Sequence, residues 1–215
     1  MYISIHPDNP EERKIDQVVK ILQSGGVIIY PTDTVYGIGC DIRQQEAIEK
    51  VCRIRGLKPE KAALSIMCKD ISQIADYTQQ IDTPYFKLLK KHLPGPFTFI
   101  LNSNNTVPKM FKNKKRTIGI RIPENKIVLA LIEALGAPIL TTSLKSDDEI
   151  LEYFTDPSEI YEDFELQVDI VIDGGIGKNV PSTIVDLTNN EPVVIREGAG
   201  EFMLNFFDIN FKIKF

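Results

Sequence analysis

The chain has 215 residues and carries 25 Lys and Arg against 30 Asp and Glu, which gives a net charge of −5. No Pro/Gly/Ser-rich linker divides it, so we expect a single domain over residues 1–215. The N-terminus lacks the basic and apolar regions of a signal peptide, and no apolar run approaches the ~18 residues of a membrane span. We therefore expect a cytoplasmic protein that does not enter a membrane.

Charge is spread unevenly along the chain. Residues 53–121 contain 14 Lys and Arg against 4 Asp and Glu, whereas residues 143–215 contain 5 against 16. This asymmetry predicts one electropositive surface on an acidic protein. The cysteines form no CxxC pair and lie among apolar residues, so we expect buried, reduced thiols at Cys40, Cys52 and Cys68.

Apolar runs and amphipathic segments alternate along the chain. Continuous apolar runs predict buried strands, and apolar residues at helical spacing predict helices. In chain order we expect a strand at 1–5, a helix from Pro10 to Gly25, a strand at 27–30, a helix at 44–55, a strand at 64–67, helices at 71–77 and 84–91, strands at 97–101 and 117–122, a helix at 127–135, a strand at 139–142, a helix at 156–164, and strands at 170–173, 183–186 and 192–196. Asp8 or Asn9 is expected to cap the first helix. This mixture indicates an α/β fold with a sheet covered by helices.

Residues suited to anions follow several of these segments. In open α/β sheets, ligands bind beyond the carboxyl ends of strands. Guanidinium, ammonium and hydroxyl groups there can bind phosphate or carboxylate oxygens. The candidates are Thr32, Tyr36, Arg55, Lys58, Lys61, Arg121, Ser143 and Arg196.

Each candidate also has an ordinary structural interpretation. An Arg on a strand is more often solvated or salt-bridged than bound to a ligand, and Ser or Thr after a strand usually belongs to a turn. Tyr36 beside glycines fits a packing aromatic whose hydroxyl has a partner. The run Lys109–Arg116 is more often a solvated loop than a binding patch. The residues alone leave both interpretations open.

Motifs of several enzyme classes are absent from the sequence. There is no GxxxxGK[ST] loop, no GxGxxG and no GxSxG elbow. The only two histidines, His6 and His92, lack metal-ligand spacing. We therefore predict no metal site formed by the protein and no histidine nucleophile or base.

Five segments form one ordered pattern: 25–37 (GGVIIYPTDTVYG), 93–98 (LPGPFT), 118–123 (IGIRIP), 182–186 (STIVD) and 196–198 (REG). Together they resemble the YrdC-like threonylcarbamoyl-AMP synthases. The match runs from about residue 14 to 200, and residues 5–10 and 142–144 look most similar to the YciO-like branch of that family.

The resemblance implies a single twisted, mixed sheet with flanking helices around a positively charged cavity. It also implies a reaction that joins L-threonine, bicarbonate and ATP into threonylcarbamoyl-AMP and pyrophosphate. That product feeds the t6A modification of tRNA, and family members have been linked to double-stranded RNA. No protein nucleophile is needed, because the protein orients the reactants and neutralises phosphate charge, with Mg²⁺ expected on the phosphates.

The resemblance also implies roles for individual residues. Thr32 and Arg121 match positions that hold threonine, and Tyr36 lies in the same opening segment as Thr32. Ser143 and Ser182 match hydroxyl positions that line the threonine and nucleotide site. The residues that we expect to bind phosphates are Arg196, Arg55, which falls at the Lys of the family's Lys-x-Arg motif, and the nearby Lys58 and Lys61.

Two positions depart from the family pattern. Leu57 replaces the Arg of Lys-x-Arg, unless Lys58 or Lys61 substitutes for it, and Lys145 replaces the Asn of Ser-x-Asn. We therefore expect a synthase weaker than typical members. The alternative is a protein that binds double-stranded RNA or a nucleotide without efficient catalysis.

Overall fold

The computed structural model describes residues 1–58, 64–108, 116–146, 152–189 and 191–202. Within these residues, ten strands form one mixed sheet in the order β1-β8-β2-β3-β7-β4-β6-β5-β9-β10. The strands are β1 (Tyr2–Ser4), β2 (Val27–Tyr30), β3 (Gly37–Asp41), β4 (Ser65–Met67), β5 (Phe97–Asn102), β6 (Thr117–Arg121), β7 (Ile139–Ser143), β8 (Ile170–Asp173), β9 (Thr183–Asp186) and β10 (Val193–Arg196). The helices are α1 (Glu12–Gln23), α2 (Gln45–Ile54), α3 (Ile71–Ala75), α4 (Thr83–His92), α5 (Lys126–Leu135) and α6 (Pro157–Phe164). The predicted mixed sheet with flanking helices is confirmed.

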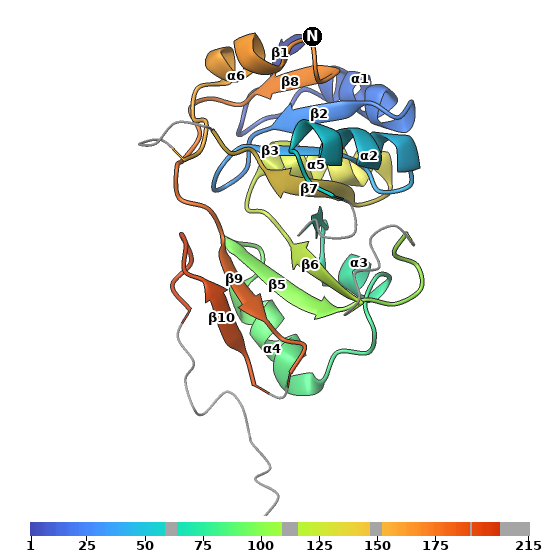
Figure 1. Cartoon of the computed structure of the whole chain (residues 1–215), viewed down its shortest axis with the longest axis vertical. Coiled ribbons are helices and arrows are strands. Elements are labelled where there is room, and N and C mark those ends of the chain that lie inside the picture. Colours follow the sequence, from blue (N-terminus) through green and yellow to red (C-terminus); the bar gives the residue numbers. More distant parts are fainter. Residues whose placement is uncertain (59–63, 109–115, 147–151, 190, 203–215) are drawn as a thin grey trace, which may run out of the picture.

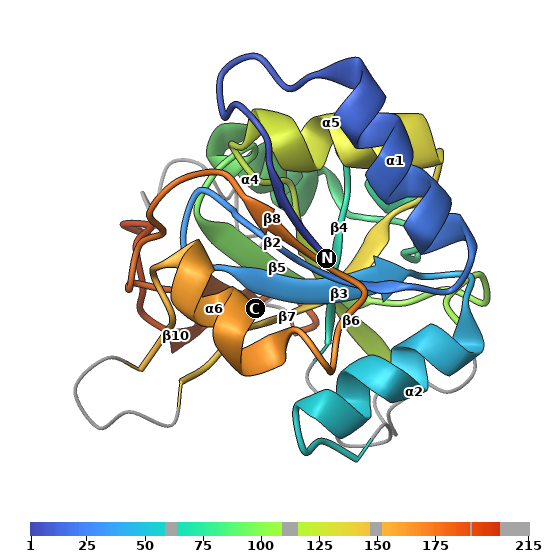
Figure 2. The same cartoon turned by 90° about the horizontal axis from the view of Figure 1, so that it is seen from above.

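The helices cover the two parts of the sheet differently. In the part formed by β1, β8, β2, β3 and β7, helices α1 and α5 lie on one face and α2 and α6 on the other (Figure 2). In the part formed by β5, β9 and β10, α4 lies behind the strands, and no helix of the described residues lies in front of them (Figure 1). The second part of the sheet therefore keeps one face available for a site.

Apolar stripes hold the helices on the sheet. In α5, Ile127, Val128, Leu131, Ile132 and Leu135 are buried, and α5 packs against α1. The side chain of Asn125 accepts a hydrogen bond from the Val128 amide (3.1 Å), and Gly136 ends the helix at a φ of 69°. Both ends of α5 thus follow the usual capping rules.

Strand β3 was not predicted from the sequence. Two of its five residues are glycines, which weaken the signal of a strand. The structure explains Gly39, because a Cβ atom there would lie 2.2 Å from the Leu140 carbonyl oxygen of the neighbouring strand β7. Gly39 is therefore needed for the close packing of β3 against β7, although glycine has a low strand propensity.

The predicted cap of α1 is wrong. Its N-cap residue is Glu11, which makes no side-chain cap hydrogen bond. The backbone amides of Asp8 and Asn9 instead donate to His6 Nδ1, at 3.2 and 3.1 Å. These contacts form a turn at residues 6–9, and Asn9 lies two residues before the N-cap position.

The prediction of buried, reduced cysteines is confirmed, since all three are free and buried. Burial raises the pKa of the Cys40 and Cys68 thiols. This disfavours their thiolate forms and so makes them poor nucleophiles. Within the described ranges, no helix has the length and apolar character needed to cross a membrane.

We predict that the α1–α5 layer carries much of the stability of the fold. Leu131→Ala should lower the free energy of unfolding by about 2–5 kcal/mol, because Leu131 is fully buried and truncation leaves a cavity. The same change at Leu166, which is 95% exposed, should alter it by less than about 0.5 kcal/mol. Urea denaturation of both variants checks this, and equal losses would contradict it.

Candidate functional site

A cavity of about 260 Å³ lies against the central strands. Its walls come from the loop after β2, the end of α2 and strands β3, β4, β5, β6, β7, β9 and β10. Seven of the nine predicted site residues line it: Thr32, Tyr36, Arg55, Arg121, Ser143, Ser182 and Arg196. Residues more than 160 positions apart in the chain thus meet in one concave site, as predicted. Their roles in binding stay a prediction.

Two predicted residues do not contribute in the same way. Lys58 is exposed and is not among the residues that line the cavity, and its role in phosphate binding stays a prediction. Its neighbour Leu57 does line the wall. Lys61 lies outside the described residues, as does most of the basic run Lys109–Arg116.

Strand alternation places the polar residues of the cavity floor. Successive side chains of a strand point to opposite faces of the sheet. In β5, Phe97 and Phe99 are buried in the core, where each ring contacts His92 of α4 edge-on, while Thr98 between them lines the cavity. In β4, Ser65 lines the cavity and Ile66 belongs to the core. One face of these strands is therefore apolar and the other is polar.

A β-bulge in β10 sets the direction of Arg196. Val194 pairs with Val185, but the next pair joins Arg196 to Ile184, so Ile195 has no opposite residue. Regular alternation would place Ile195 opposite Ile184, which lines the cavity. The extra residue shifts the alternation by one position, and Arg196 takes that place instead.

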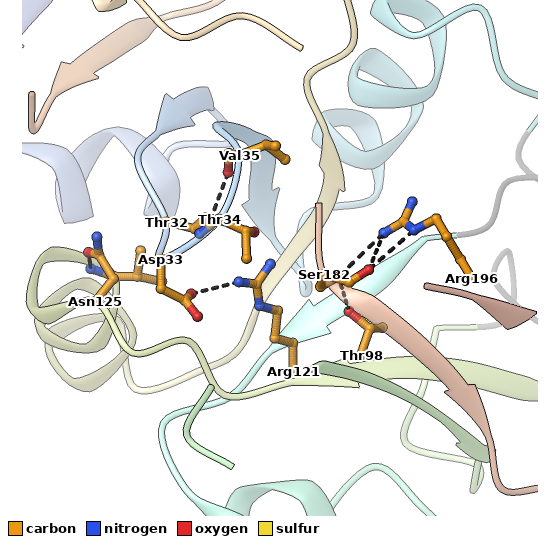
Figure 3. Close-up of polar contacts among 10 residues, drawn as sticks. Thr32, Asp33, Thr34, Val35, Thr98, Arg121, Asn125, Ser182 and Arg196 are labelled. Atoms are coloured by element: carbon orange, nitrogen blue, oxygen red, sulfur yellow. Dashed lines mark hydrogen bonds and ion pairs between the residues drawn. The ribbon is translucent and has the colours of Figure 1, made fainter. Parts of the chain in front are cut away.

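Hydrogen bonds hold Arg196 at the cavity wall. Its Nε and Nη2 atoms donate to the Ser182 carbonyl oxygen at 3.2 and 2.8 Å, and the Ser182 hydroxyl lies 2.8 Å from the Thr98 hydroxyl (Figure 3). Among the described residues, no carboxylate forms an ion pair with Arg196. Neutral groups therefore hold the Arg196 guanidinium in place, and its positive charge remains available to an anion.

Arg121 is held differently, by a buried carboxylate. Its Nη2 atom donates to Asp33 Oδ1 at 2.6 Å, and the two side chains are 6% and 10% exposed (Figure 3). Burial lowers the pKa of Arg121 while Asp33 raises it, and a guanidinium stays protonated at neutral pH. Asp33 Oδ2 and Arg121 Nε are buried without a hydrogen-bond partner among the described residues. Only one of the two hydrogen bonds that this pair could form is present.

Thr32 and Tyr36 support the wall that they line. The Thr32 hydroxyl donates to the Val35 carbonyl oxygen (2.7 Å) and accepts from the Thr34 amide (3.0 Å). The Tyr36 hydroxyl donates to the Gly175 carbonyl oxygen (2.7 Å), and burial raises its pKa. Both hydroxyls therefore have partners within the protein, as expected for a turn residue and a packing aromatic, and both residues also line the cavity.

The two departures from the family pattern both lie on the cavity wall. Leu57 presents an isobutyl group there. Lys145 pairs through its ammonium with Glu152 and lies 5.6 Å from the centre of the Tyr153 ring. Arg55 Nη1 donates to the Lys145 carbonyl oxygen at 3.2 Å, which joins the α2 wall to the segment after β7.

The sequence analysis missed several hydroxyl groups of the floor, among them Thr98 and Thr141. The Thr141 hydroxyl accepts from the buried Tyr30 hydroxyl at 2.7 Å and donates to the Ile38 carbonyl oxygen at 3.3 Å. Polar residues at alternate positions of otherwise apolar strands were the available signal. Their meeting in one place depends on the strand order, which that signal does not contain.

The described residues contain no group of three His, Cys, Asp or Glu side chains placed to hold a metal ion. The described residues that line the cavity include four cations, Arg55, Arg121, Lys145 and Arg196, and no carboxylate. This donor set suits anions such as carboxylate and phosphate. It does not fit a metal ion held by the protein.

The site is thus a cation-lined cavity on the open face of a mixed sheet. The particular family follows from comparison: residues 20–198 match the Sua5/YciO/YrdC family model, described as "Telomere recombination", and the chain belongs to this family.

Two relatives are informative. The uncharacterized protein YciO of Escherichia coli K12 is 46% identical over 202 residues, covering 93% of this chain and 96% of YciO. The crystal structure of E. coli YciO superimposes with a TM-score of 0.88 and covers 94% of this chain and 97% of that one. Threonylcarbamoyl-AMP synthase of Pyrococcus abyssi is 30% identical over 190 residues, covering 88% of this chain and 55% of the synthase. The crystal structure of P. abyssi Sua5 complexed with L-threonine has a TM-score of 0.83 at 28% identity, covering 92% of this chain and 57% of that one.

We predict that Asp33 and Arg121 depend on each other for stability. Arg121→Met should lower the free energy of unfolding by about 3–5 kcal/mol, because it leaves the Asp33 carboxylate buried without its partner. The double variant Arg121→Met/Asp33→Leu should recover most of that loss. Thermal or urea denaturation of the single and double variants measures the coupling, and additive losses would show that the pair is not coupled.

Proposed function

We propose that the chain binds L-threonine and ATP in this cavity and forms threonylcarbamoyl-AMP, with lower efficiency than family members that carry an intact Lys-x-Arg motif. The observation that carries the proposal is the set of four cations and the hydroxyls of Thr32, Ser143 and Ser182 around one cavity. Family membership and the similarity to a synthase, and to a Sua5 structure complexed with L-threonine, support it. The free, buried thiols suit a reducing compartment and support a cytoplasmic location.

The chemistry suits residues that bind but do not attack. The amine of threonine adds to CO₂ or bicarbonate, a carbamate oxygen then attacks the α-phosphorus of ATP, and pyrophosphate leaves. No step needs a protein nucleophile, and among the described lining residues there is no Ser–His or Cys–His pair. The contribution of the protein is to hold the reactants together and to stabilise charge on the phosphates.

Each end of the cavity suits a different part of the reactants. In this proposal, Arg121 and Thr32 bind the carboxylate and hydroxyl of threonine, and Arg55 and Arg196 contact phosphate oxygens. Ser143 and Ser182, which also line the cavity, bind the reactants through their hydroxyls. Because no carboxylate lines the described cavity, Mg²⁺ would enter bound to the phosphates of ATP as part of the substrate.

Leu57 favours a second candidate function. At this point of the wall, the family's guanidinium is replaced by an apolar group, which removes a charge-assisted contact with an anion. A protein that binds a nucleotide, or the phosphates of double-stranded RNA or tRNA, without efficient turnover would tolerate this loss. The two candidates differ in whether pyrophosphate is released.

The first test is binding of threonine. Thr32→Val should weaken threonine binding by about tenfold, because it removes the hydroxyl at the cavity wall. Thr155→Val, outside the residues that line the cavity, is the matched control and should leave binding unchanged. Isothermal titration calorimetry with threonine in the presence of bicarbonate and ATP measures both. Absence of threonine binding to the unmodified chain would reject the synthase proposal.

The second test concerns turnover. Leu57→Arg/Lys145→Asn should raise the rate of threonine- and bicarbonate-dependent pyrophosphate release by about tenfold or more, because one charge-assisted hydrogen bond formed in the transition state has that effect. Leu166→Arg adds the same side chain at an exposed position and should change nothing. A folded double variant that binds ATP but gains no activity would show that these two positions do not limit the reaction.

A further inference from the structure

The two ends of the cavity differ in how their positive charges are compensated. At one end, Arg121 is paired with Asp33 at 2.6 Å, and both side chains are almost fully buried. At the other end, Arg196 is held by the Ser182 carbonyl oxygen and forms no ion pair in the described part of the chain. Lys145 at that end pairs with Glu152, but these side chains are 50% and 64% exposed.

Burial decides whether a counter-charge stays in place. An exposed ion pair is screened by water and separates at little cost, so Glu152 can leave Lys145 when another anion arrives. A buried carboxylate cannot leave, because its charge would lose its partner in a medium of low polarity. The Arg121 end therefore keeps a net charge near zero, whereas the Arg196 end is positive through Arg196 and becomes more positive when Glu152 moves away from Lys145.

We propose that Asp33 is a specificity-determining residue: by neutralising Arg121, it makes that end of the cavity accept the carboxylate of an amino-acid zwitterion and exclude phosphate. The inference rests on the proposed function, since it assigns the two reactants to the two ends of the same cavity. It goes beyond that function in naming the residue that keeps them apart.

Charge, rather than hydrogen bonding, distinguishes the two ligands at this end. Asp33 Oδ2 and Arg121 Nε are buried without a partner among the described residues, and Asp33 is not among the residues that line the cavity, so both atoms are shielded from a ligand there. Phosphate carries between one and two negative charges at neutral pH and would meet the fixed charge of Asp33 beside Arg121. A carboxylate carries one charge and matches the planar guanidinium.

The experiment compares threonine binding with and without millimolar inorganic phosphate. In the unmodified chain, phosphate should change the dissociation constant of threonine by less than about twofold. In Asp33→Asn, which keeps a side-chain oxygen for Arg121 Nη2, phosphate should raise it by at least about tenfold, because the uncompensated guanidinium attracts the dianion. Glu152→Gln is the matched control: it removes a carboxylate at the other end and should not create this competition.

A second pair of variants makes the result independent of threonine. Arg55→Ala/Lys145→Ala/Arg196→Ala removes the three cations of the phosphate end and should abolish thermal stabilisation by phosphate. Adding Asp33→Asn to it should restore that stabilisation through Arg121. Because this readout uses phosphate alone, it still tests the role of Asp33 if threonine binding, and with it the proposed function, fails.

Two results would overturn the inference. One is a folded Asp33→Asn chain in which phosphate does not compete with threonine. The other is an Arg55→Ala/Lys145→Ala/Arg196→Ala chain that phosphate still stabilises while Asp33 is intact. If Asp33→Asn does not fold, this triple variant still tests the inference, since it leaves the buried pair unchanged.

Discussion

The structure depends on one constraint: the strands at the centre of the sheet must be apolar on one face and polar on the other. Ile66 of β4, Phe99 of β5 and Ile120 of β6 enter the core, while the neighbouring Ser65, Thr98 and Arg121 line the cavity. The apolar face is covered by helices and stabilises the fold through burial. The polar face is available to a ligand because, in the described residues, no helix lies over that part of the sheet (Figure 1).

Burying the polar side chains of the cavity floor next to the hydrophobic core lowers the stability of the fold unless those side chains have hydrogen-bond partners. Three contacts meet this requirement: the Tyr30 hydroxyl bonds to Thr141, the Ser182 hydroxyl lies beside that of Thr98, and Arg121 pairs with Asp33. Only the third leaves buried polar atoms without a partner among the described residues. Unsatisfied groups of this kind concentrate where a ligand or function accounts for them.

The two departures from the family pattern change the charge of the cavity wall. Leu57 removes a positive charge from the wall, whereas Lys145 adds one whose partner, Glu152, is exposed to solvent. The positive charge of the cavity wall is thus distributed differently from that of the family pattern.

The sequence by itself determined most of the local structure and the family. Hydrophobic periodicity predicted nine of the ten strands and all six helices of the described residues, because that periodicity depends on residues a few positions apart. It missed β3, whose glycines are needed for contact with a strand about a hundred residues away. It also included Lys58, which is not among the residues that line the cavity although its neighbour Leu57 is.

The tertiary structure alone decided how the site is organised. Asp33 lies 88 residues from Arg121, and nothing in either segment identifies the other as its partner. The bulge at Ile195 directs Arg196 to the cavity, although regular alternation would have placed an isoleucine there. Both features follow from the order and register of the strands, which arise from packing across the whole sheet. A pattern of neighbouring residues cannot encode them, because each is set by a contact between segments that are distant in the chain.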